Sequence, residues 1–133
     1  MIFVYGTNGT SHENAWAKAK ARYDAETFWY RGNGAIDVIP DTDFDPKKYK
    51  DRNVIIYGNA DTNTAWVTLL ADSPVQVNPD SITAGDHVYQ GDNIGCLLIR
   101  PRSDSDIASV AAITGTGVTG MQLTDRLPYF VSG

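Results

Sequence analysis

Short apolar runs and one long periodic segment alternate along the first half of the chain. Apolar runs that end at turn residues predict strands. Residues 11–30 instead repeat aromatic and small side chains at helical steps, which predicts a helix with one apolar face. The predicted strands are 2–5, 35–39, 53–57, 96–101 and 108–114, and the predicted helices are 11–30, 64–72 and 119–130.

The predicted helix 11–30 carries a start signal, a stop signal and a candidate buried face. Thr10 and Glu13 have the spacing of a capping box, in which each side chain bonds the other residue's backbone amide. Gly32-Asn33-Gly34 is the expected stop. The face expected to pack on a sheet comprises Trp16, Ala19, Tyr23, Thr27 and Tyr30.

The alternation of strands and helices predicts an α/β fold. We expect a three-layer, Rossmann-like or flavodoxin-like domain with a mostly parallel sheet. Short β-type pieces separated by turn residues predict a β-hairpin inserted between Val75 and Gln90. The segments VYGTNGTSHENAW (4–16) and IYGNADTNTAW (56–66) resemble each other, which indicates two strand-turn-helix units built alike.

Composition narrows the class of protein. A chain of 133 residues is expected to form a single domain, 1–133. A net charge of −5 with scattered basic residues disfavours nucleic acid as a partner, and no apolar run is long enough to span a membrane. Cys96 lies in an apolar run and is expected to be buried. No signal peptide opens the sequence, so the chain is either cytoplasmic or, as we expect, a domain excised from a longer exported chain.

Residues 115–120, GTGVTG, match the spacing of a dinucleotide-binding turn. Such a site also needs an acidic residue about 20 positions further on, and only 13 residues follow Gly120. A structural turn is therefore the favoured interpretation. Ligands still gather at the carboxyl ends of parallel strands, where polar residues otherwise cap helices. The candidate ligand-binding residues there are Thr7, Asn8, Asn59, Asp61, Asn63, Gly115, Thr116 and Gly117, with Thr114 on the same rim.

No catalytic or metal-binding constellation stands out. The sequence has no G-x-S-x-G motif, and its two histidines, His12 and His87, are expected to face solvent. Acidic residues alternate at 41, 43 and 45 as in an EF-hand, but proline and arginine replace the required glycine and glutamate further on. We therefore predict no catalytic residue, no metal and no cofactor in this chain.

Several long segments together carry a family resemblance. VYGTNGTSHENAWAKAKARYDAETFWYRGNG, DRNVIIYGNADTNTAW, ITGTGVTGM and PYFVSG, in that order, resemble the C-terminal region of bacterial exported proteins that carry a preceding prolyl-oligopeptidase-like α/β-hydrolase domain. The resemblance implies an accessory domain, with the nucleophile, acid and histidine upstream. It also implies a periplasmic or extracellular location and a chain that continues past the PYFVSG segment.

Three functions remain open. The leading hypothesis is a non-catalytic accessory domain of a secreted hydrolase or peptidase, whose partner is the catalytic domain of the same chain or a second copy of itself. The alternative is a small-molecule, nucleotide or phosphate-binding module that uses the glycine turns at the carboxyl ends of the strands. A third is a structural subunit that dimerises through an aromatic surface formed by Phe28 and Trp29, provided that these project away from Trp16.

Overall fold

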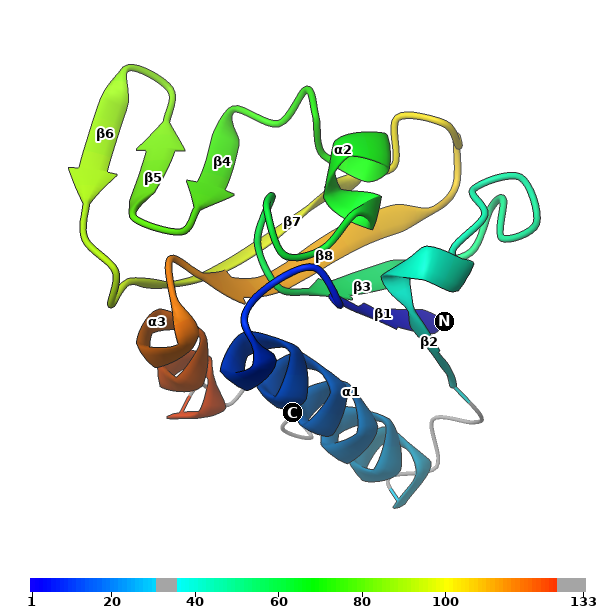
Figure 1. Cartoon of the computed structure of the whole chain (residues 1–133). Helices are drawn as coiled ribbons and strands as arrows, with labels where there is room; N and C mark the ends of the chain where they lie inside the picture. The colour runs from blue at the N-terminus through cyan, green and yellow to red at the C-terminus, as the bar shows by residue number, and fades with distance from the viewer. Residues whose placement is uncertain (31–35, 127–133) are drawn as a thin grey trace.

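The computed structural model describes residues 1–30 and 36–126 (Figure 1). The elements are β1 (Ile2–Tyr5), α1 (Ser11–Tyr30), β2 (Asp37–Pro40), η1 (Asp41–Asp43), β3 (Val54–Tyr57), α2 (Ala65–Leu69), β4 (Val75–Asn78), β5 (Ser81–Ala84), β6 (His87–Gln90), β7 (Gly95–Pro101), β8 (Ser109–Gly115), α3 (Val118–Leu123) and η2 (Thr124–Arg126). The predicted stop at 32–34 and the part of the last predicted helix beyond residue 126 lie outside the described residues.

Helix α1 has the predicted bounds, and its capping box is confirmed. The backbone amide of Glu13 donates to the Thr10 hydroxyl at 3.2 Å, and the amide of Thr10 donates to the Glu13 carboxylate at 3.0 Å. These bonds satisfy two of the amides that a helix start leaves without partners. The capping box at 10–13 therefore marks the observed start of the helix.

A five-stranded sheet, sheet A, has the order β2-β1-β3-β8-β7. Its first four strands are parallel, and β7 is antiparallel to β8. The central strand β3 is buried along its whole length, as expected for an apolar parallel strand covered on both faces. The edge position of β7 leaves one side of that strand without a neighbouring strand among the described residues.

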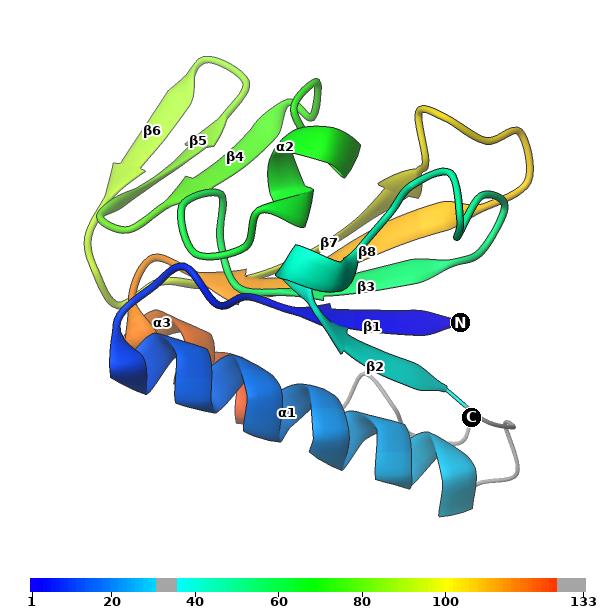
Figure 2. The ribbon, with the colours of Figure 1, turned by 45° about the vertical axis from the view of Figure 1, so that its right-hand side comes forward.

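Helices α1 and α3 cover one face of sheet A (Figure 2). Phe3, Ile55 and Ile113 from the sheet pack there against Trp16 and Met121. Among the described residues, no helix is both long and apolar enough to cross a membrane.

The predicted buried face of α1 is wrong at Ala19 and Tyr23; Trp16 is buried, Thr27 is half-buried, and the side chain of Tyr30 lies outside the described residues. Ala19 is exposed and Tyr23 is 65% exposed, whereas Ala17 and Ala21 are buried against the sheet. The small alanine side chains let the helix approach the strands closely, while the large ring of Tyr23 stays in solvent under the ammonium group of Lys20, 5.6 Å from it.

The aromatic surface predicted at Phe28 is also wrong. Phe28 is half-buried and packs edge-on against Phe3, with ring centroids 5.9 Å apart, in the same layer as Trp16. It therefore points toward the sheet. The side chain of Trp29 lies outside the described residues.

The opposite face of sheet A is covered by α2 and by a second, antiparallel sheet of order β4-β5-β6, sheet B (Figures 1 and 2). Trp66 and Leu69 from α2 and Val77 and Ile82 from sheet B are buried there in one cluster with Ile56. A three-stranded sheet and a five-residue helix thus take the place in which a Rossmann-like fold has a layer of helices.

The prediction of a three-layer Rossmann-like or flavodoxin-like domain is therefore wrong. The structure combines a mixed sheet A with a separate sheet B. The single hairpin expected between Val75 and Gln90 is instead three strands joined by two tight turns. The physical reason lies in 75–90, where apolar residues alternate over short pieces and turn residues separate them. Because successive side chains of a strand point to opposite faces, short strands place these alternating apolar residues on one buried face, which a helix would not do.

Candidate functional site

The residues predicted to bind a ligand come together at one edge of sheet A. Strands β1, β3 and β8 are parallel, so the segments that follow them meet at their carboxyl ends. The set comprises Thr7 and Asn8 after β1, Asn59, Asp61 and Asn63 after β3, and Thr114, Gly115, Thr116 and Gly117 at or just after the end of β8. Its capacity to bind depends on which polar atoms remain free.

Asn59 is fully buried and its side chain is occupied. Its amide nitrogen donates to the carbonyl of Gly115 at 3.0 Å, and its oxygen accepts from the backbone amides of Asp61 and Thr62, both at 3.0 Å. This side chain therefore ties the turn after β3 to the end of β8.

The side chain of Asn63 likewise links β1, β3 and α2 through hydrogen bonds to their backbones. Its amide nitrogen donates to the carbonyls of Val4 and Tyr57, and its oxygen accepts from the amide of Ala65, each at 3.0 Å. Both donor hydrogens of the buried Asn63 side chain and one of the two acceptor positions of its oxygen are thus used within the fold.

The crevice between the segments after β1 and β3 is filled by the chain itself. The amide of Asn8 donates to the carbonyl of Thr62 at 2.9 Å, and its side chain donates to the carbonyl of Asp61 at 3.0 Å. A β-carbon at Gly6 would overlap that Thr62 carbonyl. In open α/β sheets a ligand occupies this position, but here two backbone segments touch.

The glycines of GTGVTG permit close packing. A β-carbon at Gly115 would overlap the backbone of α3, one at Gly120 would overlap the backbone of Ile94, and one at Gly117 would lie 2.8 Å from the carbonyl oxygen of Asp92. These are the approaches for which glycine is needed between a strand, a turn and a helix. The geometry therefore agrees with the structural interpretation of the motif.

The two threonines beside these glycines are fully buried. Thr116 accepts from the amide of Ile94 through its hydroxyl and donates its own amide to the Ile94 carbonyl, both at 3.0 Å. The Thr114 hydroxyl has no hydrogen-bond partner among the described residues. Neither hydroxyl reaches the surface.

Three of the predicted ligand-binding residues, Thr7, Asn8 and Asp61, remain exposed. The Thr7 hydroxyl donates to the buried carboxylate of Asp41 at 2.6 Å, and the other Asp41 oxygen accepts from the amide of Thr64 at the start of α2. This carboxylate holds η1, the segment after β1 and α2 together, whereas the sequence marked Asp41 only as the first acidic residue of a rejected EF-hand pattern. Ligand binding at this edge stays a prediction.

Groups with catalytic or metal-binding potential are dispersed. His12 on α1 and His87 on β6 are both exposed. Burial raises the pKa of the half-buried Cys96 thiol, which disfavours a reactive thiolate. Among residues 1–30 and 36–126, no cluster of three or more histidine, cysteine, aspartate or glutamate side chains is arranged to hold a metal ion.

An apolar surface groove lies over β7 and β8, on the face that also carries α1. We call it the β7–β8 groove; it has a volume of about 410 Å³ and is lined in part by Ile55, Leu97, Ile99, Ala111 and Ile113. Helix α1 packs on β1, β2 and β3, and α3 packs where β8 ends and β7 begins; only strand residues line the groove, so no described helix covers it. Ile99 is 74% exposed in consequence.

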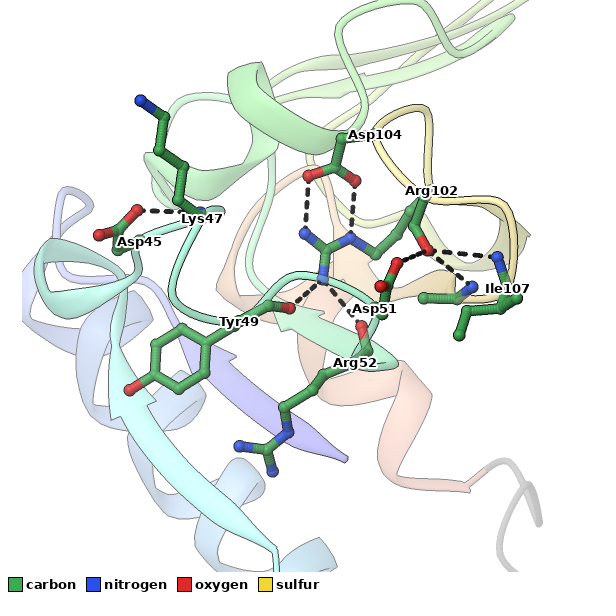
Figure 3. Close-up of polar contacts among 10 residues, drawn as sticks. Asp45, Lys47, Tyr49, Asp51, Arg52, Arg102, Asp104 and Ile107 are labelled. Atoms are coloured by element: carbon green, nitrogen blue, oxygen red, sulfur yellow. Dashed lines mark hydrogen bonds and ion pairs between the residues drawn. The ribbon is translucent and has the colours of Figure 1, made fainter.

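A buried arginine that sequence reasoning missed fixes the far end of β7 (Figure 3). The Arg102 side chain is fully buried, and its guanidinium forms a two-point pair with Asp104 at 2.9 and 2.7 Å. Its remaining nitrogen donates to the carbonyls of Tyr49 and Arg52 at 2.7 and 2.8 Å. Because an arginine beside an acidic turn ordinarily faces solvent, no sequence signal marks Arg102.

The same region is held by a second contact. The Ser105 hydroxyl donates to the Asp51 carboxylate at 2.6 Å and accepts from the amide of Ala108 at 3.1 Å. Asp51 has a positive φ of 65°, a conformation in which aspartate is tolerated better than most residues. The loops before β3 and before β8 are therefore locked to each other at the end of the sheet opposite the predicted ligand site.

The Asp104 pair predicts a pH-dependent stability. Hydrogen bonding to Arg102 holds the pKa of Asp104 below its ordinary value of 3.8. Because the folded state then binds a proton less readily than the unfolded state, the stabilisation is complete above pH 3.8 and is lost as the pH falls through the folded pKa. Asp104→Asn should therefore lower the free energy of unfolding at pH 7 by roughly 1 kcal/mol, since the carboxylate is partly screened by solvent.

Urea unfolding curves of the wild type and Asp104→Asn between pH 2.5 and pH 7 would measure this loss. The matched control is Asp106→Asn, which removes an exposed carboxylate two residues away. A stability difference between Asp104→Asn and the wild type that stayed constant down to the lowest pH would contradict the assignment to this ion pair.

Comparisons with known proteins add no family to this picture. Neither a scan of protein-family models nor searches of curated proteins and solved structures found a match to this chain.

Proposed function

We propose that this chain is a non-catalytic accessory domain that packs against the catalytic module of a secreted hydrolase or peptidase. The observation that carries the proposal is the β7–β8 groove. Two of the residues that line this groove are exposed: the exposed fraction is 74% for Ile99 and 39% for Leu97. Apolar surface that forms a continuous groove commonly marks a site of protein contact, whereas scattered exposed residues do not.

The nature of the partner rests on the sequence resemblance. A hydrolase module in the same polypeptide would supply the nucleophile, acid and histidine, and this chain would shape access to them or stabilise their fold. An exported location belongs to the same proposal. The dispersal of His12, His87 and Cys96 over separate elements agrees with a role in which this chain contributes no catalytic group.

The proposal predicts that Ile99→Asp disrupts packing in the native full-length polypeptide. A buried carboxylate without a partner opposes docking strongly. Limited proteolysis should then release this domain at least about tenfold faster than in the wild type, because local opening sets the cleavage rate. The control is Val67→Asp, since Val67 is 70% exposed on α2 and outside the groove.

Two results would contradict the proposal separately. Equal cleavage rates for Ile99→Asp and Val67→Asp would remove the groove as the docking surface. An intact mass and peptide map of the native polypeptide that contained no hydrolase module, together with no hydrolase bound to it, would remove the accessory role.

A further inference from the structure

The hydrogen-bond pattern of β7 shows which of its backbone groups are free. The amide of Arg102 donates to the carbonyl of Ala108, and the amide of Thr116 donates to the carbonyl of Ile94. Both pairs continue the β7–β8 register, in which paired residues keep a constant sum of residue numbers. Because bonded and non-bonded pairs alternate in an antiparallel ladder, the even-numbered residues of β7 bond to β8.

The odd-numbered residues of β7 therefore present their backbone groups to the open edge. Leu97 and Ile99 each offer an amide donor and a carbonyl acceptor there, and no described strand lies beyond them. Pro101, which has no amide hydrogen, also occupies an outward position, where proline costs the sheet no hydrogen bond. An edge of this kind is a template for another strand.

Apolar grooves flank this edge on both faces of the sheet. The β7–β8 groove lies on the side of Leu97 and Ile99, and a second groove of about 270 Å³ on the other side is lined in part by Pro74, Val75 and Leu98. An added strand points alternate side chains to opposite faces. Its side chains would therefore enter each groove in turn.

One charge stands on this otherwise apolar edge. Arg100 lines the second groove, and its guanidinium makes only a 3.4 Å contact to the backbone carbonyl of Asp72, with no ion pair to a carboxylate among the described residues. A strand that carried a carboxylate opposite Arg100 would supply the missing partner. Strand β7 itself, GCLLIRP, has no carboxylate, so a second copy of this chain would not supply one by pairing through β7.

We propose that β7 accepts an extended segment of the partner polypeptide as an added antiparallel strand. This inference rests on the proposed function and specifies how the partner is held. The segment has apolar side chains facing Leu97 and Ile99 and an acidic side chain facing Arg100. Main-chain hydrogen bonds to the free groups of Leu97 and Ile99 provide affinity, and the flanking grooves with Arg100 provide specificity.

A synthetic peptide, acetyl-TEVTVTT-amide, is the probe for this mode of binding. In the antiparallel register its two valines lie opposite Ile99 and Leu97, and its glutamate lies opposite Arg100. Titration into the ¹⁵N-labelled chain should give saturable shifts of the Leu97 and Ile99 amide signals. The same peptide with both valine nitrogens methylated keeps its side chains but loses two donors, and should bind at least about tenfold more weakly.

Charge exchange tests the role of Arg100. The lysine peptide acetyl-TKVTVTT-amide should bind the wild type more weakly than the glutamate peptide, and Arg100→Glu should reverse that preference. Equal binding of the methylated and unmethylated peptides would overturn the proposal. So would shifts confined to another strand, an unchanged preference in Arg100→Glu, or no saturable shift up to the solubility limit of the peptide.

A proline variant separates this inference from the proposed function. Ile99→Pro removes an outward amide without breaking a bond to β8, and Ile99→Ala removes comparable side-chain contacts but keeps the amide. In the full-length proteolysis assay, strand addition predicts faster release for Ile99→Pro than for Ile99→Ala. Equal release of both, faster than the wild type, would retain docking through the groove and reject the added strand. Wild-type rates for both variants and for Ile99→Asp would reject the groove itself as the docking surface, and with it the added strand.

Discussion

Replacing Arg102 with methionine is expected to lower the free energy of unfolding by about 3–5 kcal/mol. Methionine fills similar space but forms none of the hydrogen bonds of the buried guanidinium. The carbonyls of Tyr49 and Arg52 then lose a charged donor inside the fold, and Asp104 loses its partner. Because these bonds join the loop before β3 to the turn between β7 and β8, the substitution destabilises that end of sheet A.

Urea denaturation at pH 7 measures this loss, with Arg52→Met as the matched control. Arg52 also pairs with an aspartate, Asp37, at 2.8 Å, but both side chains are substantially exposed. Exposed pairs of this kind contribute no more than about 1 kcal/mol. The prediction would be contradicted if Arg102→Met lowered the free energy of unfolding by no more than Arg52→Met does. The hydrogen bonds of the buried guanidinium would then contribute little to stability.

Gly120→Ala is expected to destabilise the chain by about 3 kcal/mol. In an isolated helix the same change is favourable by roughly 1 kcal/mol, because glycine has the greater conformational freedom in the unfolded state. Here a β-carbon at Gly120 would overlap the backbone of Ile94, which cannot move aside as a flexible side chain would. The sign of the effect therefore reports whether α3 packs directly on the segment that enters β7.

The free energy of unfolding of Gly120→Ala should be compared with that of Gly85→Asn. Gly85 has a φ of 60° and open space around its α-carbon, a conformation that asparagine tolerates. Gly85→Asn should therefore be nearly neutral. If Gly120→Ala left the free energy of unfolding unchanged or raised it, the close packing of residues 115–120 would be refuted. The phosphate-binding interpretation of GTGVTG would then be favoured again.

Local signals in the sequence located most of the regular structure. The Thr10–Glu13 capping box and the helical period place α1 at its observed bounds. The apolar runs at 2–5 and 53–57 correspond to β1 and β3. These predictions succeeded because strand and helix propensities, caps and turns act between neighbours in the chain.

The candidate site could be predicted only in part. Parallel strands bring the polar residues after β1, β3 and β8 to one edge, as the sequence indicates. The sequence does not reveal that the side chains of Asn59 and Asn63 form their hydrogen bonds with the backbone. Nor does it reveal that Arg102 is buried rather than exposed to solvent. Those outcomes depend on partners that lie dozens of residues away along the chain.

The sequence by itself determined that this protein is a mixture of helices and short strands, because period, capping and turn chemistry are properties of neighbouring residues. Only the tertiary structure decided what covers each face of sheet A, and that β7 is an antiparallel edge strand with an open groove. Apolar alternation in 75–90 is compatible with a hairpin or with a third layer of strands. The choice between them depends on which apolar surface of sheet A remains to be buried.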